Sequence, residues 1–279
     1  MTIEPFFLTV GGSQRFCLLH TVDAGQVVRG ALVYIHPFAE EMNKTRRMAA
    51  LQARAMAAAG YTVLQIDLHG CGDSSGDFGD ADWSGWVDDV LAAAAWLRQR
   101  SQVPLWVWGL RAGCLLATEA ARRNDAVEGL LLWQPVVSGR QHLQQFLRLK
   151  SAGEMLAGDS KGVMQGLKSE LAQGRSVEVA GYRLSTGLAK GLEAADLALP
   201  ERAVHVEWLE VAATPENGLS VVANSRLEQW TELGHSVRGR VVGGPSFWQT
   251  TEIEENHTLV AATLDALATL PVLGRRDVS

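Results

Sequence analysis

The sequence is poor in cysteine and has neither a cluster of basic residues nor a long apolar run. Its three cysteines, Cys17, Cys71 and Cys114, show no CxxC spacing, which argues against a disulfide framework or a zinc site. Lys and Arg number 25 against 31 Asp and Glu, for a formal net charge of −6. Nucleic-acid surfaces need clustered Lys and Arg, so we expect no nucleic-acid partner. No stretch reaches the roughly 18 apolar residues of a membrane-spanning helix, so we expect no membrane span.

Residues 1–6 lack the basic start and apolar middle of a signal peptide. Because the cysteines also suit free thiols in a reducing compartment, we expect a cytoplasmic protein. The 279 residues are 47% apolar, which is enough for a large core. We expect a small-molecule ligand, no metal and no cofactor, and the sequence is compatible with a homodimer.

Apolar runs alternate along the first half of the chain in a pattern typical of an α/β protein. Strands are predicted at residues 6–10, 15–21, 31–35, 61–66, 103–108 and 127–133. Helices are predicted at residues 44–59, 83–100 and 112–123, with Asp82 as the N-cap of the second and Gly60 ending the first. Strands that are apolar on both faces belong in a buried parallel sheet, so the alternation predicts a doubly wound, mostly parallel sheet.

Residues 138–200, called the cap segment below, interrupt this alternation. The segment is too long for an ordinary connection in a compact domain, so we expect an inserted helical cap over one edge of the sheet. Expected elements are helices at 141–149 and 161–171 within it, and strands 204–211 and 239–243 and helices 220–233 and 254–270 after it. The predicted domains are therefore a core in two parts, residues 1–137 and 201–279, and the cap between them.

Three motifs follow three of the predicted strands. Residues 106–113 read Trp-Val-Trp-Gly-Leu-Arg-Ala-Gly, a strand, Gly-x-x-x-Gly and helix layout that is typical of a nucleophile elbow. His36-Pro37-Phe38 follows the strand at 31–35, and Asp-Leu-His-Gly-Cys-Gly-Asp-Ser begins at Asp67. With these motifs in this order, the sequence resembles the α/β-hydrolase superfamily. The resemblance implies an eight-stranded sheet with N-terminal antiparallel strands, an oxyanion loop at 36–38 and a cap insertion.

The residues at the superfamily's catalytic positions differ in this chain. Arg111 stands at the nucleophile position, and a guanidinium is neither nucleophilic nor deprotonated in proteins. Glu216 is a displaced acid, and Ser246 stands near the position of the histidine. Because a Ser–His–Asp triad needs all three roles, the resemblance implies a degenerate triad. The alternative is a displaced triad with His257 as its base.

A narrower resemblance rests on residues 133–143, Trp-Gln-Pro-Val-Val-Ser-Gly-Arg-Gln-His-Leu, and residues 245–250, Pro-Ser-Phe-Trp-Gln-Thr, together with the elbow residues 109–111. These stretches resemble the exosortase A system-associated hydrolases of the second type. Such bacterial α/β-hydrolase relatives are found alongside the machinery for exopolysaccharide and sorted envelope proteins. The resemblance implies a role in such a system, but its hydrolase label comes from the fold, which does not by itself deliver activity.

Arg111 has two interpretations. At a helix N-terminus a guanidinium suits a carboxylate or phosphate, which predicts a pocket for an anionic or acylated small molecule. The expected binding residues are His36, Pro37, Phe38, Leu110, Arg111, Ala112, Trp133, Phe247 and Trp248. In the other interpretation the guanidinium fills the former active site by pairing internally with one of four carboxylates, Glu40, Glu41, Asp67 or Glu216.

The tryptophans and the cap residues also have alternative interpretations. Tryptophans at 106, 108, 133, 208 and 248 either line an aromatic pocket at the carboxyl ends of the strands or fill the core. Arg140, His142, Arg148 and Lys150 are expected on the solvated face of a cap helix, and contact with an anionic lipid is the alternative. Two functions therefore remain open: a non-catalytic protein that binds an anionic or acylated saccharide or lipid precursor, and an active esterase, thioesterase or deacylase with an unconventional site.

Overall fold

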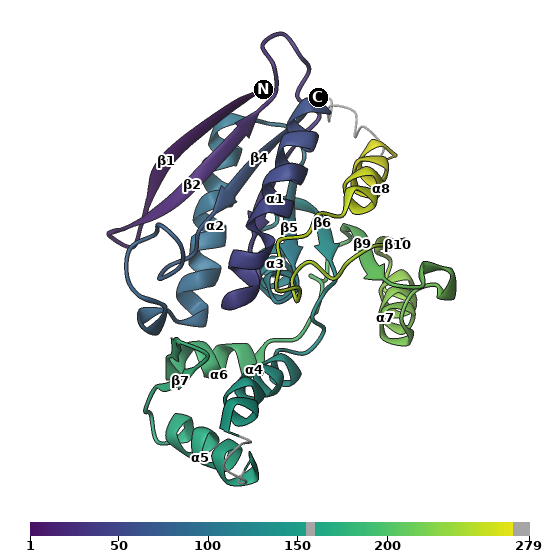
Figure 1. Cartoon of the computed structure of the whole chain (residues 1–279). Helices are drawn as coiled ribbons and strands as arrows, with labels where there is room; N and C mark the ends of the chain where they lie inside the picture. The colour runs from purple at the N-terminus through teal and green to yellow at the C-terminus, as the bar shows by residue number, and fades with distance from the viewer. Residues whose placement is uncertain (155–159, 270–279) are drawn as a thin grey trace.

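An eight-stranded sheet forms the centre of the molecule (Figure 1). The computed structural model describes residues 1–154 and 160–269 and places the strands in the order β1-β2-β4-β3-β5-β6-β9-β10. Strand β2 (Ser13–Thr21) pairs antiparallel with β1 (Thr2–Val10) and with β4 (Tyr61–Ile66), and the remaining neighbours pair in parallel. This confirms the predicted mostly parallel sheet with N-terminal antiparallel strands.

The central strands are buried on both faces, as their continuous apolar runs predict. Every residue of β3 (Gly30–Ile35) and β5 (Leu105–Leu110) is buried, and β6 (Val127–Trp133) is buried except at Glu128. Beyond them lie β9 (His205–Ala212) and the edge strand β10 (Ser236–Gly243). β5 begins two residues later than predicted, and β10 begins three residues earlier.

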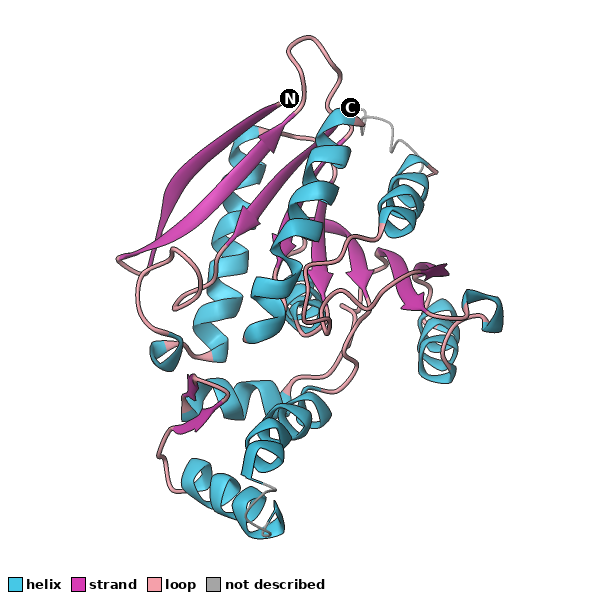
Figure 2. Ribbon diagram, in the orientation of Figure 1, coloured by secondary structure: helices cyan, strands magenta, loops and turns pink. Residues whose placement is uncertain are grey.

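Helices cover both faces of the sheet (Figure 2). Helices α1 (Glu40–Ala58) and α8 (His257–Ala268) pack on one face, and α2 (Trp83–Arg100), α3 (Gly113–Arg123) and α7 (Val221–Glu232) on the other. The predicted N-cap of α2 is confirmed, since the side chain of Asp82 accepts a hydrogen bond from the backbone N–H of Gly85 at 2.9 Å. Residue 270, the expected end of the last helix, lies outside the described residues.

The cap segment lies beyond the carboxyl ends of the parallel strands (Figure 1). It contains α4 (Gly139–Glu154), α5 (Ser160–Ala172), β7 (Val177–Val179), β8 (Tyr182–Leu184) and α6 (Thr186–Ala194). Rings of Phe38 and Phe146 pack edge to face at 5.0 Å, as do those of Phe78 and Tyr182. The cap segment is therefore packed directly on the core. Over the described residues, no helix is both long and apolar enough to cross a membrane.

Candidate functional site

The turn between β5 and α3 has the backbone geometry of a nucleophile elbow. Arg111, at its apex, has a φ of 55°, in the left-handed region that residues with side chains rarely adopt. A Cβ on Gly109 would lie 2.7 Å from the Cα of Cys114, and a Cβ on Gly113 would lie 2.5 Å from the carbonyl oxygen of Ile35. Only glycine fits at these two positions, so the Gly-x-x-x-Gly motif forms the turn that its spacing predicts.

The Arg111 guanidinium pairs with Glu41, one of the four carboxylates that the sequence offers as partners. Its Nε and Nη2 both donate to Oε1 of Glu41 at 3.3 Å, so the pair uses one carboxylate oxygen. Both side chains are about 15% exposed. The guanidinium carbon also lies 5.6 Å from the ring centroid of Trp248, within the range of a cation–π contact. Arg111 therefore pairs internally with Glu41, but only two of its three guanidinium nitrogens, Nε and Nη2, take part in the pair.

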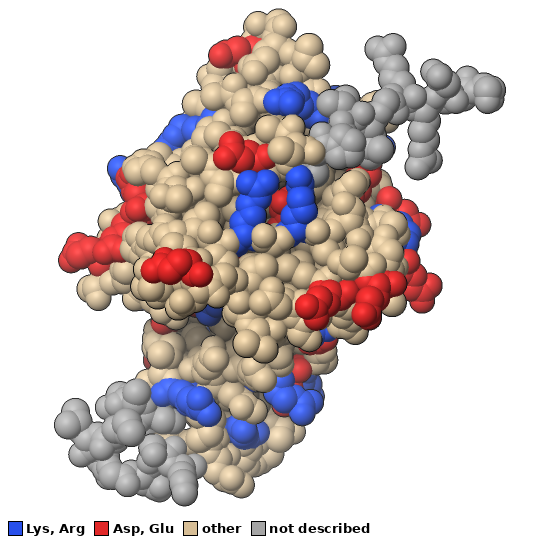
Figure 3. Space-filling model, turned by 90° about the vertical axis from the view of Figure 1, so that its right-hand side faces the viewer, with Lys and Arg blue, Asp and Glu red and all other residues tan. Residues whose placement is uncertain are grey.

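A cavity of about 330 Å³ lies at this pair, between the core and helix α4 of the cap segment. It is lined by Phe38, Glu40, Glu41, Lys44, Arg111, His142, Gln145, Phe146, Leu149, Trp248 and Gln249. Figure 3 shows a recess in the surface between the larger core and the cap segment. We call this cavity the elbow pocket. Its lining combines two cations, two carboxylates and three aromatic side chains.

Burial shifts the protonation equilibria of two groups in the elbow pocket. The pKa of the Glu41 carboxyl is raised because burial disfavours its charged form, and the charge of Arg111 opposes this shift. Burial, with a smaller contribution from Arg111, lowers the pKa of His142 to about 4. The imidazole of His142 is therefore neutral at pH 7 and can both donate and accept a hydrogen bond.

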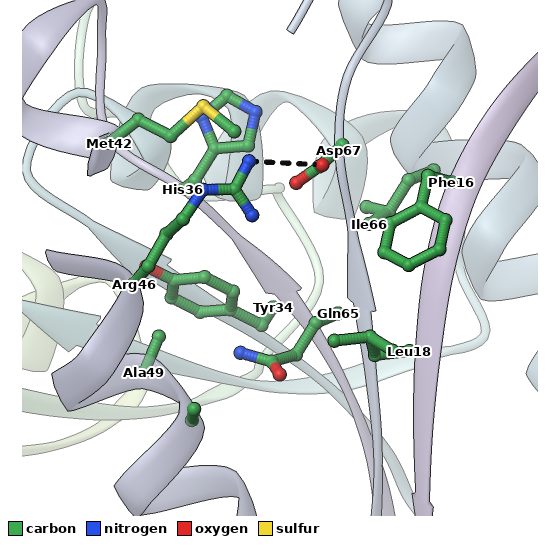
Figure 4. Close-up of a pocket in the computed structure, with 11 residues that line it drawn as sticks. Phe16, Leu18, Tyr34, His36, Met42, Arg46, Ala49, Gln65, Ile66 and Asp67 are labelled. Atoms are coloured by element: carbon green, nitrogen blue, oxygen red, sulfur yellow. Dashed lines mark hydrogen bonds and ion pairs between the residues drawn. The ribbon is translucent and has the colours of Figure 1, made fainter. Parts of the chain in front are cut away.

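His36 and Pro37 do not line the elbow pocket. The Nδ1 of His36 bonds to the carbonyl oxygen of Pro37 at 2.8 Å, and its Nε2 accepts from the backbone N–H of Leu68 at 3.3 Å. His36 lines a second cavity of about 170 Å³ (Figure 4), where Arg46 points toward Asp67 and pairs with it at 3.1 Å. Both ring nitrogens are used within the fold, so His36 braces two loops. Of the predicted oxyanion loop, only Phe38 lines the elbow pocket.

The other triad-equivalent residues are not brought to Arg111. Glu216, in a 3-10 turn at Pro215–Asn217, is exposed. Ser246 is half-buried and does not line the elbow pocket, whereas Trp248, two residues further on, extends over the guanidinium. His257 is 77% exposed and pairs with Glu255 at 3.1 Å. Of the loop after β10, it is therefore the indole of Trp248 that reaches the elbow, and not Ser246.

The strand tryptophans fill the core, as the second interpretation of the tryptophan excess predicts. Trp106, Trp108, Trp133 and Trp208 are at most 4% exposed, and only Trp248 reaches the elbow pocket. Three further expected binding residues, Leu110, Ala112 and Phe247, are also buried and do not line it. The aromatic wall is formed instead by Phe38, Phe146 and Trp248.

His142 differs most from its sequence prediction. The expectation of a solvated face is wrong for this residue, because its side chain is 7% exposed and packs edge to face on Phe38 at 5.8 Å. The sequence signal that could have found it is its spacing on α4, since His142, Gln145, Phe146 and Leu149 recur at helical intervals and form one face. Helix α4 therefore presents a polar and aromatic face to the elbow.

The described residues include neither a reactive thiol nor a cluster of metal-ligating side chains. All three cysteines are free and buried. Burial raises the pKa of Cys17 to about 12 and raises those of Cys71 and Cys114 further, so each thiol is protonated at pH 7. Within residues 1–154 and 160–269, no group of three His, Cys, Asp or Glu side chains is placed to hold a metal ion.

Comparison with solved structures places this fold among the α/β hydrolases. Est1E from Butyrivibrio proteoclasticus, solved with ferulic acid, aligns with a TM-score of 0.66 at 14% identity, over 94% of this chain and 96% of that one. A soluble variant of monoglyceride lipase from Saccharomyces cerevisiae, in complex with a substrate analog, aligns with a TM-score of 0.58 at 13% identity, over 96% of each chain. At these identities the likeness shows the fold alone.

The family model Hydrolase_4, described as serine aminopeptidase, S33, matches residues 26–183. This is more than half of the chain, and the chain belongs to this family. It is also 30% identical over 109 residues to Protein ABHD12B of Homo sapiens. That match covers 37% of this chain and 29% of the human protein, so the chain spans less than a third of that relative.

Proposed function

We propose that this chain is a non-catalytic member of the α/β hydrolases that binds an anionic or acylated small molecule in the elbow pocket. We place it, on its sequence resemblance, in a bacterial exopolysaccharide system associated with exosortase A. The observation that carries the proposal is Arg111 at the apex of the elbow. A guanidinium cannot attack an acyl carbon, and in this proposal the triad is degenerate.

The strained backbone of the elbow supports a retained function for this turn. Arg111 keeps a positive φ, which costs on the order of 1 kcal/mol or more for a residue with a side chain. Such strain persists only where the surroundings enforce it, and it clusters at functional sites. The turn directs the guanidinium into the elbow pocket in the way that it would direct a nucleophile. In this proposal the elbow therefore places a cation in the pocket.

Two cations and three aromatic side chains define the ligand class. Arg111 uses Nε and Nη2 on Glu41, and among the described residues its Nη1 has no hydrogen-bond partner. Lys44 also lines the pocket, where it bonds weakly to the carbonyl oxygen of Gln249 at 3.5 Å. Carboxylates and phosphates match these donors. An acyl chain or ring fits against the aromatic wall, and the carboxylic acid bound to Est1E is a ligand of this kind.

The remaining parts of the proposal concern organisation and location. We propose residues 138–200 as a cap on a core formed by residues 1–137 and 201–279, supported by the way that α4 closes one side of the elbow pocket. We also propose a cytoplasmic location, which three buried free thiols support.

A direct test combines a turnover assay with a binding assay. The purified chain is incubated with p-nitrophenyl butyrate, an acyl thioester and an aminoacyl p-nitroanilide, and we expect no turnover above the buffer rate. Octanoate and octanol are then titrated while the fluorescence of Trp248 and the other tryptophans is followed. We expect octanoate to bind at least about tenfold more tightly than octanol, and Arg111→Met to abolish that preference. Arg47→Met, on the solvent side of α1 with a side chain 60% exposed, is the matched control.

Turnover by the parent chain that disappears in Arg111→Ala would contradict the proposal and favour the unconventional esterase, thioesterase or deacylase. A back-substitution sharpens the result. Arg111→Ser combined with Trp248→His places a hydroxyl and an imidazole at the elbow. Any gain of esterase activity over the parent would show that the chain is a hydrolase that lost its catalytic residues by substitution.

A further inference from the structure

Four polar atoms of the elbow pocket are buried without a hydrogen-bond partner. They are Oε2 of Glu40, Oε2 of Glu41, Nδ1 of His142 and Nε1 of Trp248, and none of them bonds to any atom of residues 1–154 and 160–269. All four residues line the same cavity. Buried polar atoms in native proteins are almost always paired, so a cluster of unpaired ones at a cavity calls for a partner that occupies the cavity.

The elbow pocket carries charges of both signs. Arg111 pairs with Glu41, and Lys44 lies near enough to lower the pKa of the same carboxyl. With Glu40, the lining residues therefore carry two carboxylates and two cations. The Oε2 atoms of Glu40 and Glu41 are hydrogen-bond acceptors, and neither receives a hydrogen bond from the described residues. A ligand that supplies donors would satisfy both.

Hydroxyl groups match all four atoms. A hydroxyl both donates and accepts, so it satisfies a carboxylate oxygen, either tautomer of a neutral imidazole and an indole N–H. The carboxamides of Gln145 and Gln249 add further donors and acceptors around the same cavity. A ligand with several hydroxyl groups can meet these atoms at once, whereas a plain fatty acid has only its carboxylate.

The aromatic side chains supply the complementary apolar surface. Phe38, Phe146 and Trp248 line the same cavity as the unpaired acceptors. A saccharide ring has hydroxyl groups around its rim and apolar C–H groups on its faces, so it fits a pocket lined by both polar atoms and aromatic rings. The second cavity, at His36, offers a contrast, since of its lining side chains only Tyr34 has an unpaired buried atom.

We infer that the elbow pocket binds the saccharide ring of an anionic sugar, with hydroxyl groups on Glu40, Glu41 and His142 and the anionic substituent on Arg111. This inference rests on the proposed function and names its ligand class. It assigns Glu40 and His142 as residues that select hydroxyl groups, and Arg111 as the residue that selects charge.

Binding of five probes tests the inference, measured by calorimetry on the full chain. D-glucuronate carries hydroxyl groups and a carboxylate, cyclohexanecarboxylate carries only the carboxylate, methyl glucoside only the hydroxyl groups, and hexylamine an ammonium; inorganic phosphate reports anion binding without a ring. We expect glucuronate to bind about tenfold or more tightly than cyclohexanecarboxylate. Glu40→Met and His142→Phe should reduce that ratio about fivefold each. Glu193→Met, a carboxylate 53% exposed on α6, is the matched control and should leave the ratio unchanged.

The outcomes separate the inference from the proposed function. Equal affinity for glucuronate and cyclohexanecarboxylate, or a preference for hexylamine, overturns the inference, and in the first case anion binding still stands. Binding of methyl glucoside as tight as that of glucuronate, unaffected by Arg111→Met, supports the hydroxyl selection but overturns the role of Arg111 in the inference and contradicts the anionic part of the proposed function. If none of the five probes binds, both fail. Circular dichroism of each variant establishes that it is folded.

Discussion

Among the residues that the structure describes, two pairs of arginine and carboxylate have both side chains at most 15% exposed, and they differ in how completely their hydrogen bonds are satisfied. In the first, between β2 and α2, Nε of Arg15 lies 2.6 Å from Oδ1 of Asp89, while Oδ2 of Asp89 accepts the backbone N–H of His69 at 2.8 Å. Arg15 also donates to the hydroxyl of Ser13 at 2.7 Å. In the second pair, Arg111 and Glu41 meet at 3.3 Å through one carboxylate oxygen, and the other oxygen has no partner among the described residues.

This difference distinguishes an ion pair that holds the fold from one that belongs to a site. A buried charge is costly unless it is paired and its remaining hydrogen-bonding capacity is used. The pair at Asp89 meets this condition with protein atoms alone, because both carboxylate oxygens are bonded. The pair at Glu41 meets it only in part, because one carboxylate oxygen has no partner among the described residues, and both residues of the pair line a cavity. Stability should therefore depend strongly on the first pair and ligand binding on the second.

The largest expected effect is that of Asp89→Ala. Removing this carboxylate leaves the Arg15 guanidinium, which is 6% exposed, without its counter-charge. We expect the free energy of unfolding to fall by about 3–5 kcal/mol, measured by urea denaturation. Asp88→Ala, at an exposed position on the same helix, is the control and should change stability by less than about 0.5 kcal/mol. A small effect of Asp89→Ala would remove the contrast between the two pairs.

His142 should make stability depend on pH. Its pKa is lowered from 6.5 to about 4 in the folded chain, so between these values the unfolded chain binds more protons. The contribution of neutral His142 to the free energy of unfolding is complete above pH 6.5 and is lost as the pH falls toward 4. Between pH 7 and pH 4.5 the parent should lose about 2 kcal/mol more stability than His142→Phe, in urea denaturation at each pH. Identical pH profiles would show that His142 is not held neutral beside Arg111.

Arg111→Met should have a smaller effect on stability than either change above. The pair is long and uses one oxygen, and Lys44 still lies near the freed Glu41 carboxylate. We expect the free energy of unfolding to fall by about 1 kcal/mol, measured by urea denaturation at pH 7. A loss as large as that of Asp89→Ala would instead show that Arg111 and Glu41 form a structural pair.

The fold could be predicted from the sequence because its signals are local. Buried strands such as β4 and β6 are mostly apolar runs whose predicted bounds are those observed. Helix α6 was missed because Thr186–Ala194 is short and contains two glycines, and the start of β10 because an edge strand carries polar residues such as Arg238. The Gly-x-x-x-Gly turn was predicted because close packing permits only glycine there.

The elbow pocket could be predicted only in part, because it joins segments that no local pattern connects. Glu41, Arg111 and Trp248 lie far apart in the chain, after β3, β5 and β10, and they meet at one cavity although β6 and β9 lie between β5 and β10 in the sheet. Glu41 was one of four carboxylates predicted as possible partners of Arg111. Only the path of the chain after β3 shows that it is the one that pairs with Arg111. His142 was placed in solvent because the docking of α4 on Phe38 is a tertiary contact.

The smallest expected effect is that of His257→Gln, which extends the comparison to a third, exposed pair. His257 bonds to Glu255, which also pairs with Arg47, and the His257 and Arg47 side chains are 77% and 60% exposed. Exposed pairs contribute little, so we expect a change in unfolding free energy below about 0.5 kcal/mol. Binding of glucuronate should also be unchanged, because His257 does not line the elbow pocket. If His257→Gln instead abolished binding or a hydrolytic activity, the loop after β10 would have to bring this imidazole to the elbow in place of Trp248. The chain would then be a hydrolase with a displaced base.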